Sequence, residues 1–210
     1  MPLPDKSAKG EDAGLAGAVK SRSAHVVHLT HNDLDAVGAD AIHRMKYGND
    51  GVFTIWSPVG KFSALFSLVA SCRGNGDLLS ISDLGYHNDT ASIAGRARAN
   101  GWIVEWRDHH RWRDDEVKKI AQEVSLLRID TSVCACGIVA RDLAPENPVA
   151  AEVARVVCDT ISGVMPIPAP RCLGRCSSEK RTGSMSGTAS LPAFSVMHSS
   201  SRNMRRSKPR

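Results

Sequence analysis

The feature that most constrains the fold is a short apolar run that ends abruptly in histidines and two alternate carboxylates. The run, residues 26–29 (Val-Val-His-Leu), is too short for a typical helix and is typical of a buried parallel strand. The stretch from Ala36 to Met45 has helical composition. Asp33 and Asp35 are therefore predicted to lie between a strand and a helix, where open α/β sheets place their ligand sites. Two close carboxylates repel one another unless a cation or a shared proton intervenes, so the spacing suggests a metal site, although D-x-D is also a common helix cap.

The same arrangement recurs along the chain. Residues 77–82 are predicted to form a strand that delivers Asp83, and residues 102–106 a strand that delivers Asp108, His109 and His110. A further strand is predicted at residues 52–57, a brief extended link at 128–130, and helices at about 61–72, 88–99, 114–127, 131–143 and 148–158. Alternating strands and helices predict an α/β fold, a doubly wound parallel sheet with helices on both faces.

Composition predicts one domain with unstructured ends. Residues 1–23 have no period and are expected to form a loose leader, residues 24–163 a folded domain, and residues 164–210 a disordered basic tail rich in Ser and Arg. The net charge of the chain is +5, but residues 171–210 hold nine Lys and Arg against one acid, which leaves −3 for the rest. The tail is expected to be an uncommitted solvated segment, with a nucleic-acid arm as the alternative.

Apolar segments and cysteines bear on the environment of the protein. The longest apolar run, residues 62–72, is too short to span a bilayer, so we expect a soluble, cytoplasmic protein with no membrane contact. The cysteines at positions 72, 134, 136 and 158 lie in apolar stretches and are expected to be reduced. The cysteine spacings Cys134-x-Cys136 and Cys172-x-x-x-Cys176 lack the paired C-x-x-C of structural zinc sites.

The polar clusters, taken in order, resemble the DHH phosphoesterase superfamily, which includes RecJ-like and oligoribonuclease-like members. The superfamily is named for the triplet that stands here as Asp108-His109-His110. The resemblance covers about residues 24–160 and rests on four ordered motifs: a histidine with D-x-D, the lone Asp83, the triplet, and an acid about fifty residues later, Asp159.

The resemblance implies a metal-dependent phosphohydrolase that acts on a phosphodiester in a nucleotide or short oligonucleotide. It implies a two-metal centre, usually Mn²⁺ with Mg²⁺ possible, whose cations acidify the attacking water. Oxygen ligands with one or two imidazoles suit these cations. By resemblance, Asp33 and Asp35 each take a metal, Asp83 bridges, His109 and Asp159 complete the shells, His31 is a further ligand, His110 contacts the substrate phosphate, and Asp108 orients a histidine.

Two departures from the family pattern leave alternatives open. Leu29 stands where many members have a histidine, and His25 and His28 are expected to be ordinary strand histidines. Nothing after residue 170 resembles the glycine-rich histidine motif of the family's C-terminal substrate domain. The alternatives are a truncated, catalytically impaired core that still binds metal, and a nucleic-acid binding protein that uses the basic tail. No obligate protein partner is indicated.

The sequence after Asp159 admits two interpretations. A shift of reading frame there would explain a tail rich in Ser and Arg as the out-of-frame product of a GC-rich gene. The printed Cys-Asp-Thr160 also resembles the fourth motif of related pyrophosphatases, which favours the printed frame. The nucleotide sequence of the gene would decide between them.

Overall fold

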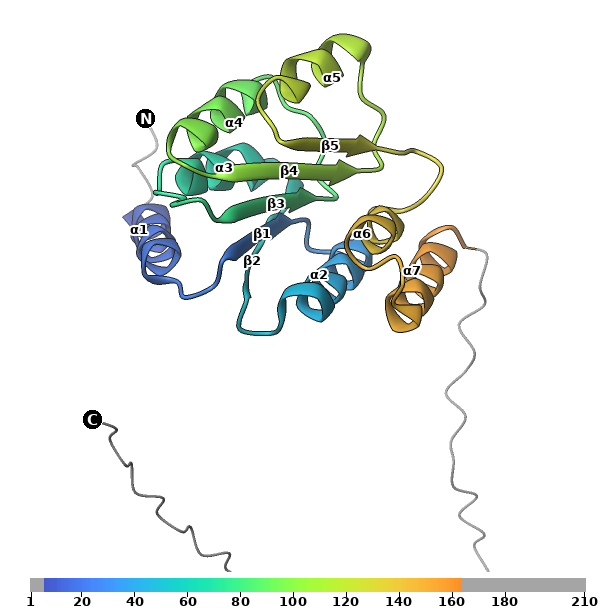
Figure 1. Cartoon of the computed structure of the whole chain (residues 1–210). Coiled ribbons are helices and arrows are strands. Elements are labelled where there is room, and N and C mark those ends of the chain that lie inside the picture. The colour runs from blue at the N-terminus through green and yellow to red at the C-terminus, as the bar shows by residue number, and fades with distance from the viewer. Residues whose placement is uncertain (1–5, 164–210) are drawn as a thin grey trace, which may run out of the picture. The chain divides into compact units, whose positions relative to one another are not determined.

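A five-stranded, all-parallel sheet forms the centre of the computed structural model, which describes residues 6–163. The strands are β1 (Val26–Thr30), β2 (Val52–Trp56), β3 (Leu78–Ser82), β4 (Ile103–Asp108) and β5 (Leu126–Ile129), in the order β2-β1-β3-β4-β5 (Figure 1). The chain reverses its direction of travel across the sheet between β1 and β3, and ligand sites of open α/β sheets lie beside such a reversal. The predicted tail, residues 164–210, lies outside the described residues.

Helices cover both faces of the sheet, so the predicted fold class is confirmed. One layer holds α2 (Leu34–Tyr47), α6 (Ala135–Leu143) and α7 (Pro148–Ile161), which pack against one another (Figure 1). The other layer holds α1 (Lys6–Ser21), α3 (Phe62–Ala70), α4 (Thr90–Ala99) and α5 (Asp114–Ala121), with the short helix η1 (Val59–Lys61) leading into α3. Each face of the strands is therefore shielded from water, as parallel sheets require.

Each layer has its own hydrophobic core. Under the α3 and α4 layer, the indole of Trp106 packs edge to face against Phe62 and Phe66, with ring centroids 5.5 and 5.8 Å apart. Between α2, α6 and α7 the core consists of small residues and short aliphatic side chains, mainly Ala, Val and Cys. A Cβ atom at Gly38 would lie 2.7 Å from Sγ of Cys136 and 2.9 Å from Cγ2 of Val157. Only glycine lets α2 approach α6 and α7 this closely.

Two sequence-based expectations about secondary structure were wrong. Residues 6–21, expected to be part of a loose leader, form helix α1, because Leu15 and the fully buried Val19 pack on the core. Leu15 and Val19 are two large apolar residues in a segment of sixteen, which is too few to give a recognisable helical pattern. The helix expected to reach residue 127 ends at Ala121, and residues 126–129 pair with β4 as a short edge strand.

The cysteines differ in part from the expectation. Cys134 and Cys158 form a disulfide, which links the start of α6 to α7, so the prediction of reduced thiols was wrong for this pair. The two lie 24 residues apart in sequence and become neighbours only when α7 folds back along α6. Cys72 and Cys136 are free and buried, as predicted. Among residues 6–163, no helix combines the length and the apolar character needed to cross a bilayer.

Candidate metal centre

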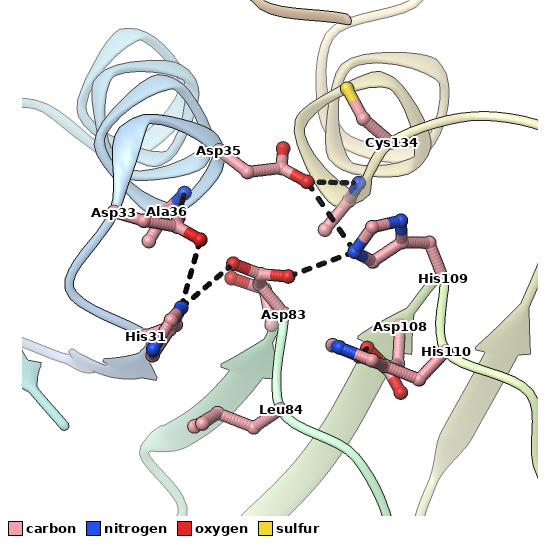
Figure 2. Close-up of polar contacts among 12 residues, drawn as sticks. His31, Asp33, Asp35, Ala36, Asp83, Leu84, Asp108, His109, His110 and Cys134 are labelled. Carbon is pink, nitrogen blue, oxygen red and sulfur yellow. Dashed lines mark hydrogen bonds and ion pairs between the residues drawn. The ribbon is translucent and has the colours of Figure 1, made fainter. Parts of the chain in front are cut away.

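The polar residues that follow β1, β3 and β4 meet at the edge of the sheet where the strands end, which we call the carboxyl edge. His31 and Asp33 follow β1, Asp83 follows β3, and His109 and His110 follow β4 (Figure 2). Strand order explains the meeting, since β1, β3 and β4 are consecutive neighbours in the sheet. Most of the predicted ligands therefore lie together.

Asp83 lies at the centre of the cluster in an unusual backbone conformation. Its φ of +57° falls in the left-handed region, which non-glycine residues rarely adopt, and it is only 3% exposed. Its Oδ1 lies 3.1 Å from Nε2 of His109. Its Oδ2 accepts no hydrogen bond from any residue that the structure describes, and Nδ1 of His31 lies 3.8 Å away. A buried carboxylate oxygen without a donor is costly unless a ligand satisfies it.

His31 and Asp33 form one flank of the cluster. Asp33 caps helix α2, since its Oδ1 accepts a hydrogen bond from the N–H of Ala36 at 3.1 Å. Its Oδ2 lies 2.9 Å from Nδ1 of His31. Burial alone would raise the pKa of Asp33, but the hydrogen bonds from Ala36 and His31 outweigh it and hold the pKa below the ordinary value. This carboxylate is therefore ionised at neutral pH.

Asp35 forms the opposite flank and ties it to helix α6. It is 2% exposed, and its two oxygens accept hydrogen bonds from the N–H groups of Ala135 and Cys136 at 2.8 and 2.6 Å. These are the first N–H groups of α6, which have no partner within the helix and attract negative charge. Burial raises the pKa of Asp35 in spite of them. Its Oδ2 lies 3.8 Å from Nε2 of His109, so the histidine faces both Asp35 and Asp83.

The electrostatics of the cluster favour a cation. The pKa of Asp83 is raised to about 6, first by burial and then by the charges of Asp35 and Asp33, in spite of the hydrogen bond to His109. The pKa of His109 is raised, chiefly by its hydrogen bond to Asp83. Carboxylates that crowd together in this way hold protons that a divalent cation would displace.

Asp108 supports His110 and does not face the other acids. It is fully buried; its Oδ1 lies 2.7 Å from Nδ1 of His110, and its Oδ2 accepts a hydrogen bond from the indole N–H of Trp112 at 2.6 Å. The hydrogen bond to Asp108 raises the pKa of His110. Because Nδ1 donates to the carboxylate, the imidazole orientation is fixed and Nε2 stays available to a ligand.

The ligand atoms fall into two groups that share Asp83. One group is His31, Asp33 and Asp83, and the other is Asp83, His109 and His110; within each group the ligand atoms lie within 4.8 Å of one another. Carboxylate oxygens with imidazole nitrogens, and no thiolate, are donors that suit Mn²⁺ or Mg²⁺. The residues present therefore fit a pair of divalent cations with a shared carboxylate between them.

The structure does not bring Asp159 into this cluster. Asp159 lies on α7, and its Oδ2 accepts a hydrogen bond at 3.0 Å from Arg155, one helical turn earlier. Helix α7 packs against α2 and α6 and follows no strand, so it does not deliver a side chain to the carboxyl edge as β1, β3 and β4 do. The prediction that Asp159 completes a metal shell has no support from its contacts within residues 6–163.

Two contributions to the site were missed from the sequence. The N–H groups of α6 carry no side-chain signal, since any residue type supplies them. The buried side chains of His28, Thr30 and Ser82 did leave a signal. Polar residues recur at alternate positions of β1 and β3, and such a pattern in a buried strand indicates an internal hydrogen-bond network.

Comparison with known proteins gives a fold likeness and no family. No family model matches the chain, and no curated protein matches it. Solved structures that match include an uncharacterised protein from Helicobacter pylori G27 (18% identity, TM-score 0.49, covering 66% of this chain and 43% of that one). Others are a suggested phosphosugar isomerase from Bacillus subtilis (12%, 0.39, 73% and 49%) and the Vibrio vulnificus NanR protein complexed with ManNAc-6P (12%, 0.36, 75% and 62%).

The matched region spans less than two thirds of each of these three proteins. At these identities and TM-scores, the likeness carries no argument about what the chain binds or does. The functional argument therefore depends on the residues at the carboxyl edge.

Proposed function

We propose that the chain is a metal-dependent phosphohydrolase that cleaves a phosphodiester in a nucleotide or short oligonucleotide. The observation that carries the proposal is Asp83, a buried carboxylate that belongs to both ligand groups and has one oxygen without a hydrogen-bond donor among the described residues. A carboxylate shared between two cation sites is the arrangement that two-metal hydrolysis of phosphate esters requires. The order of the motifs, with its resemblance to the DHH superfamily, supports the same reading.

Each residue of the cluster has a role that follows from its contacts. His31 and Asp33 would hold one Mn²⁺ and His109 the other, with Asp83 between them; His110, the third member of the second group, would remain free for substrate. Asp35, anchored on the N–H groups of α6, lies within 3.8 Å of His109 and would add negative charge to the second site. The bound cations would supply Lewis acidity, which acidifies a water molecule and neutralises charge on the phosphate.

His110 is the residue best placed to contact substrate. Its side chain is 53% exposed, while Asp108, fully buried, holds Nδ1. With the ring fixed in this way, Nε2 can donate a hydrogen bond to a phosphate oxygen, because the neighbouring carboxylate favours the protonated imidazole. Asp108 acts through His110 and is a positioning residue.

The test is hydrolysis of a generic phosphodiester, bis-p-nitrophenyl phosphate, by the full chain. We expect Mn²⁺-dependent release of p-nitrophenol that a chelator stops and that Asp83→Asn and His109→Gln each abolish. Asp115→Asn, which changes an exposed acid on α5, is the matched control and should keep full activity. Turnover that persists in the chelator or in Asp83→Asn would refute the proposal.

A second candidate is a metal-binding core without turnover. The observation that favours it is Asp159, whose carboxylate is engaged with Arg155 on α7 instead of facing the cluster. Titration calorimetry together with hydrolysis assays distinguishes the two candidates, since both predict Mn²⁺ binding but the second predicts no hydrolysis of mononucleotides, dinucleotides or the chromogenic ester.

A further inference from the structure

We propose that a buried hydrogen-bond chain, Asp40–His28–Ser82, with Thr30 beside it, positions the carboxylate of Asp83 in the metal centre. The proposal deepens the proposed function, because it rests on that function for what Asp83 binds. The geometry of the chain itself does not depend on any ligand. Every member is nearly or fully buried, with exposures of 6% for Asp40 and 0% for His28, Ser82 and Thr30.

The chain runs from helix α2 through β1 to the end of β3. Oδ1 of Asp40 lies 3.0 Å from Nδ1 of His28, and Nε2 of His28 lies 2.8 Å from Oγ of Ser82. Burial lowers the pKa of His28, so the ring is neutral at neutral pH. An ionised carboxylate can only accept, so Nδ1 of His28 donates to Asp40 and Nε2 accepts from the hydroxyl of Ser82.

The end of the chain at Asp40 is itself anchored. Oδ2 of Asp40 accepts a hydrogen bond from Nε of Arg44 at 2.7 Å, and Oδ1 accepts one from Oγ1 of Thr54 at 2.5 Å. Burial would raise the pKa of Asp40, but the hydrogen bonds from His28, Thr54 and Arg44 lower it well below its ordinary value. Asp40 therefore stays ionised and fixed, and His28 has one orientation.

Ser82 is held through both its side chain and its backbone. Oγ1 of Thr30 donates to the carbonyl oxygen of Ser82 at 3.0 Å and lies 2.9 Å from its hydroxyl. The next residue, Asp83, has its left-handed φ of +57°, and its N–H donates to the carbonyl of Arg107 at 3.1 Å. A non-glycine residue keeps such a conformation only when its surroundings over-determine it. The contacts at Ser82 supply that constraint directly before the turn.

The Ser-His-Asp order is that of a hydrolytic triad, but the chain cannot act as one. A nucleophilic serine must reach its substrate, but Ser82 is fully buried between β1 and β4, its hydroxyl donates to His28, and its carbonyl oxygen accepts from Thr30. The hydrogen-bond chain therefore has a structural role: it sets where the Asp83 carboxylate points relative to His109 and His31.

A second, parallel chain in the same sheet serves as an internal control. Nδ1 of His43 donates to the carbonyl of Ala39 at 2.8 Å, and Nε2 lies 2.8 Å from Oγ of Ser80. His43 stacks on His28 with ring centroids 3.9 Å apart, and Ser80 is as buried as Ser82. Ser80 lies two residues earlier on β3, where its hydroxyl also accepts a hydrogen bond from Nη1 of Arg107 at 3.5 Å. The two serines are alike in burial and in having a histidine partner, but only Ser82 directly precedes Asp83.

The experiment compares Ser82→Ala with Ser80→Ala, and Thr30→Val with Thr30→Ser, all in the full chain. Titration calorimetry with Mn²⁺ alone gives the affinity, and crystal structures of the metal-free variants give the position of Asp83. We expect Ser82→Ala and Thr30→Val to weaken Mn²⁺ binding about tenfold and to lose the contact between Asp83 and His109. Ser80→Ala should bind Mn²⁺ with an affinity within about twofold of the wild type, and so should Thr30→Ser, which keeps the hydroxyl that Thr30→Val removes.

The outcomes separate the proposal from a general packing effect and from the proposed function. Equal loss of affinity in Ser80→Ala and Ser82→Ala, or an unmoved Asp83 in the crystal structure of Ser82→Ala, overturns the proposal. If Ser82→Ala fails to fold, the Thr30 pair decides in the same way. If the wild type binds no Mn²⁺, the proposed function is wrong, and the metal-free crystal structures still decide whether Ser82 and Thr30 position Asp83.

Discussion

Strand β3 has an aspartate beside each of its ends, and the two carboxylates have opposite surroundings. Asp77, just before the strand, has its Oδ2 2.5 Å from Nη2 of Arg22 and its Oδ1 2.9 Å from Nδ1 of His25. Asp83, just after the strand, has a histidine on one oxygen and no hydrogen-bond donor on the other among the described residues. Asp77 is paired with a permanent cation, while Asp83 faces two further carboxylates.

The difference separates a structural acid from one that is kept available for a ligand. An acid paired with arginine contributes stability and has no further use for a cation. An acid held beside others without a permanent counterion costs stability, and proteins retain such costs mainly at functional sites. Substitutions at each end of β3 test this distinction.

The largest effect is expected from Asp77→Asn, which should lower the free energy of unfolding by about 3 kcal/mol. The side chain of Arg22 is only 4% exposed, and its guanidinium stacks 4.4 Å over the ring of Trp102, so the change leaves a buried cation without its partner. Urea denaturation of the metal-free chain measures the loss. Mn²⁺ binding should not change, and a stability loss below about 1 kcal/mol would contradict the structural reading of this pair.

The complementary change, Asp83→Asn, should leave the metal-free protein at least as stable as the wild type and weaken Mn²⁺ binding roughly 100-fold, which is about 2.7 kcal/mol. The amide removes one of three crowded negative charges but cannot replace a shared carboxylate. Thermal unfolding with and without Mn²⁺ gives both readouts, since a bound cation raises the melting temperature by mass action. An undiminished shift with Mn²⁺ would show that Asp83 is not a ligand.

The pH dependence of stability should differ between wild type and Asp83→Asn by about 2 kcal/mol in the metal-free state. The folded pKa of Asp83 is about 6, raised from 3.8, so between pH 4 and 6 the folded state holds a proton that the unfolded state has released. Stability is therefore lost as pH rises through this window. Urea unfolding in chelator at pH 4, 5, 6 and 7 measures it. Parallel curves for the two proteins would mean that the pKa of Asp83 is not raised.

The smallest effect is expected at His25, the histidine beside Asp77. Its side chain is 87% exposed, so His25→Gln should change the free energy of unfolding by less than about 0.5 kcal/mol, because an exposed ion pair is worth little. His109→Gln, the matching change at the other end of β3, should instead reduce the response to Mn²⁺. Equal effects of the two substitutions in both assays would remove the distinction between the ends of the strand.

The residues of the site that could be predicted from the sequence are those that follow the ends of strands. Parallel strands bring their carboxyl ends to one edge, so a polar residue directly after an apolar run, such as Asp33 or Asp83, is located once the run is recognised as a strand. The same rule could not locate Asp159, because the acid lies within a helix that follows no strand. Asp159 was predicted from its place in the order of motifs, about fifty residues after the triplet, and that order does not show whether the acid follows a strand.

The parts that could not be predicted depend on packing between distant segments. The hydrogen bonds of Asp35 come from backbone N–H groups, and the left-handed conformation of Asp83 is usually a glycine or asparagine signal in sequence. Strand β5 was predicted only as a brief extended link at residues 128–130, because its four residues lie at the sheet edge, none is fully buried, and they have no clear alternation. Helix α1, which packs on the core, was not predicted because its apolar residues have only a weak helical periodicity.

The hydrogen bonds that Asp35 accepts from α6 span 100 and 101 residues of sequence. Because the ribosome makes the chain from its amino end, Asp33, Asp35 and Asp83 all emerge well before Ala135 and Cys136. A nascent chain can pair β1, β2 and β3 in this interval, but the carboxylate of Asp35 then has water in place of its helical donors. The carboxyl edge is thus completed only after α6 has been made and has docked on Asp35.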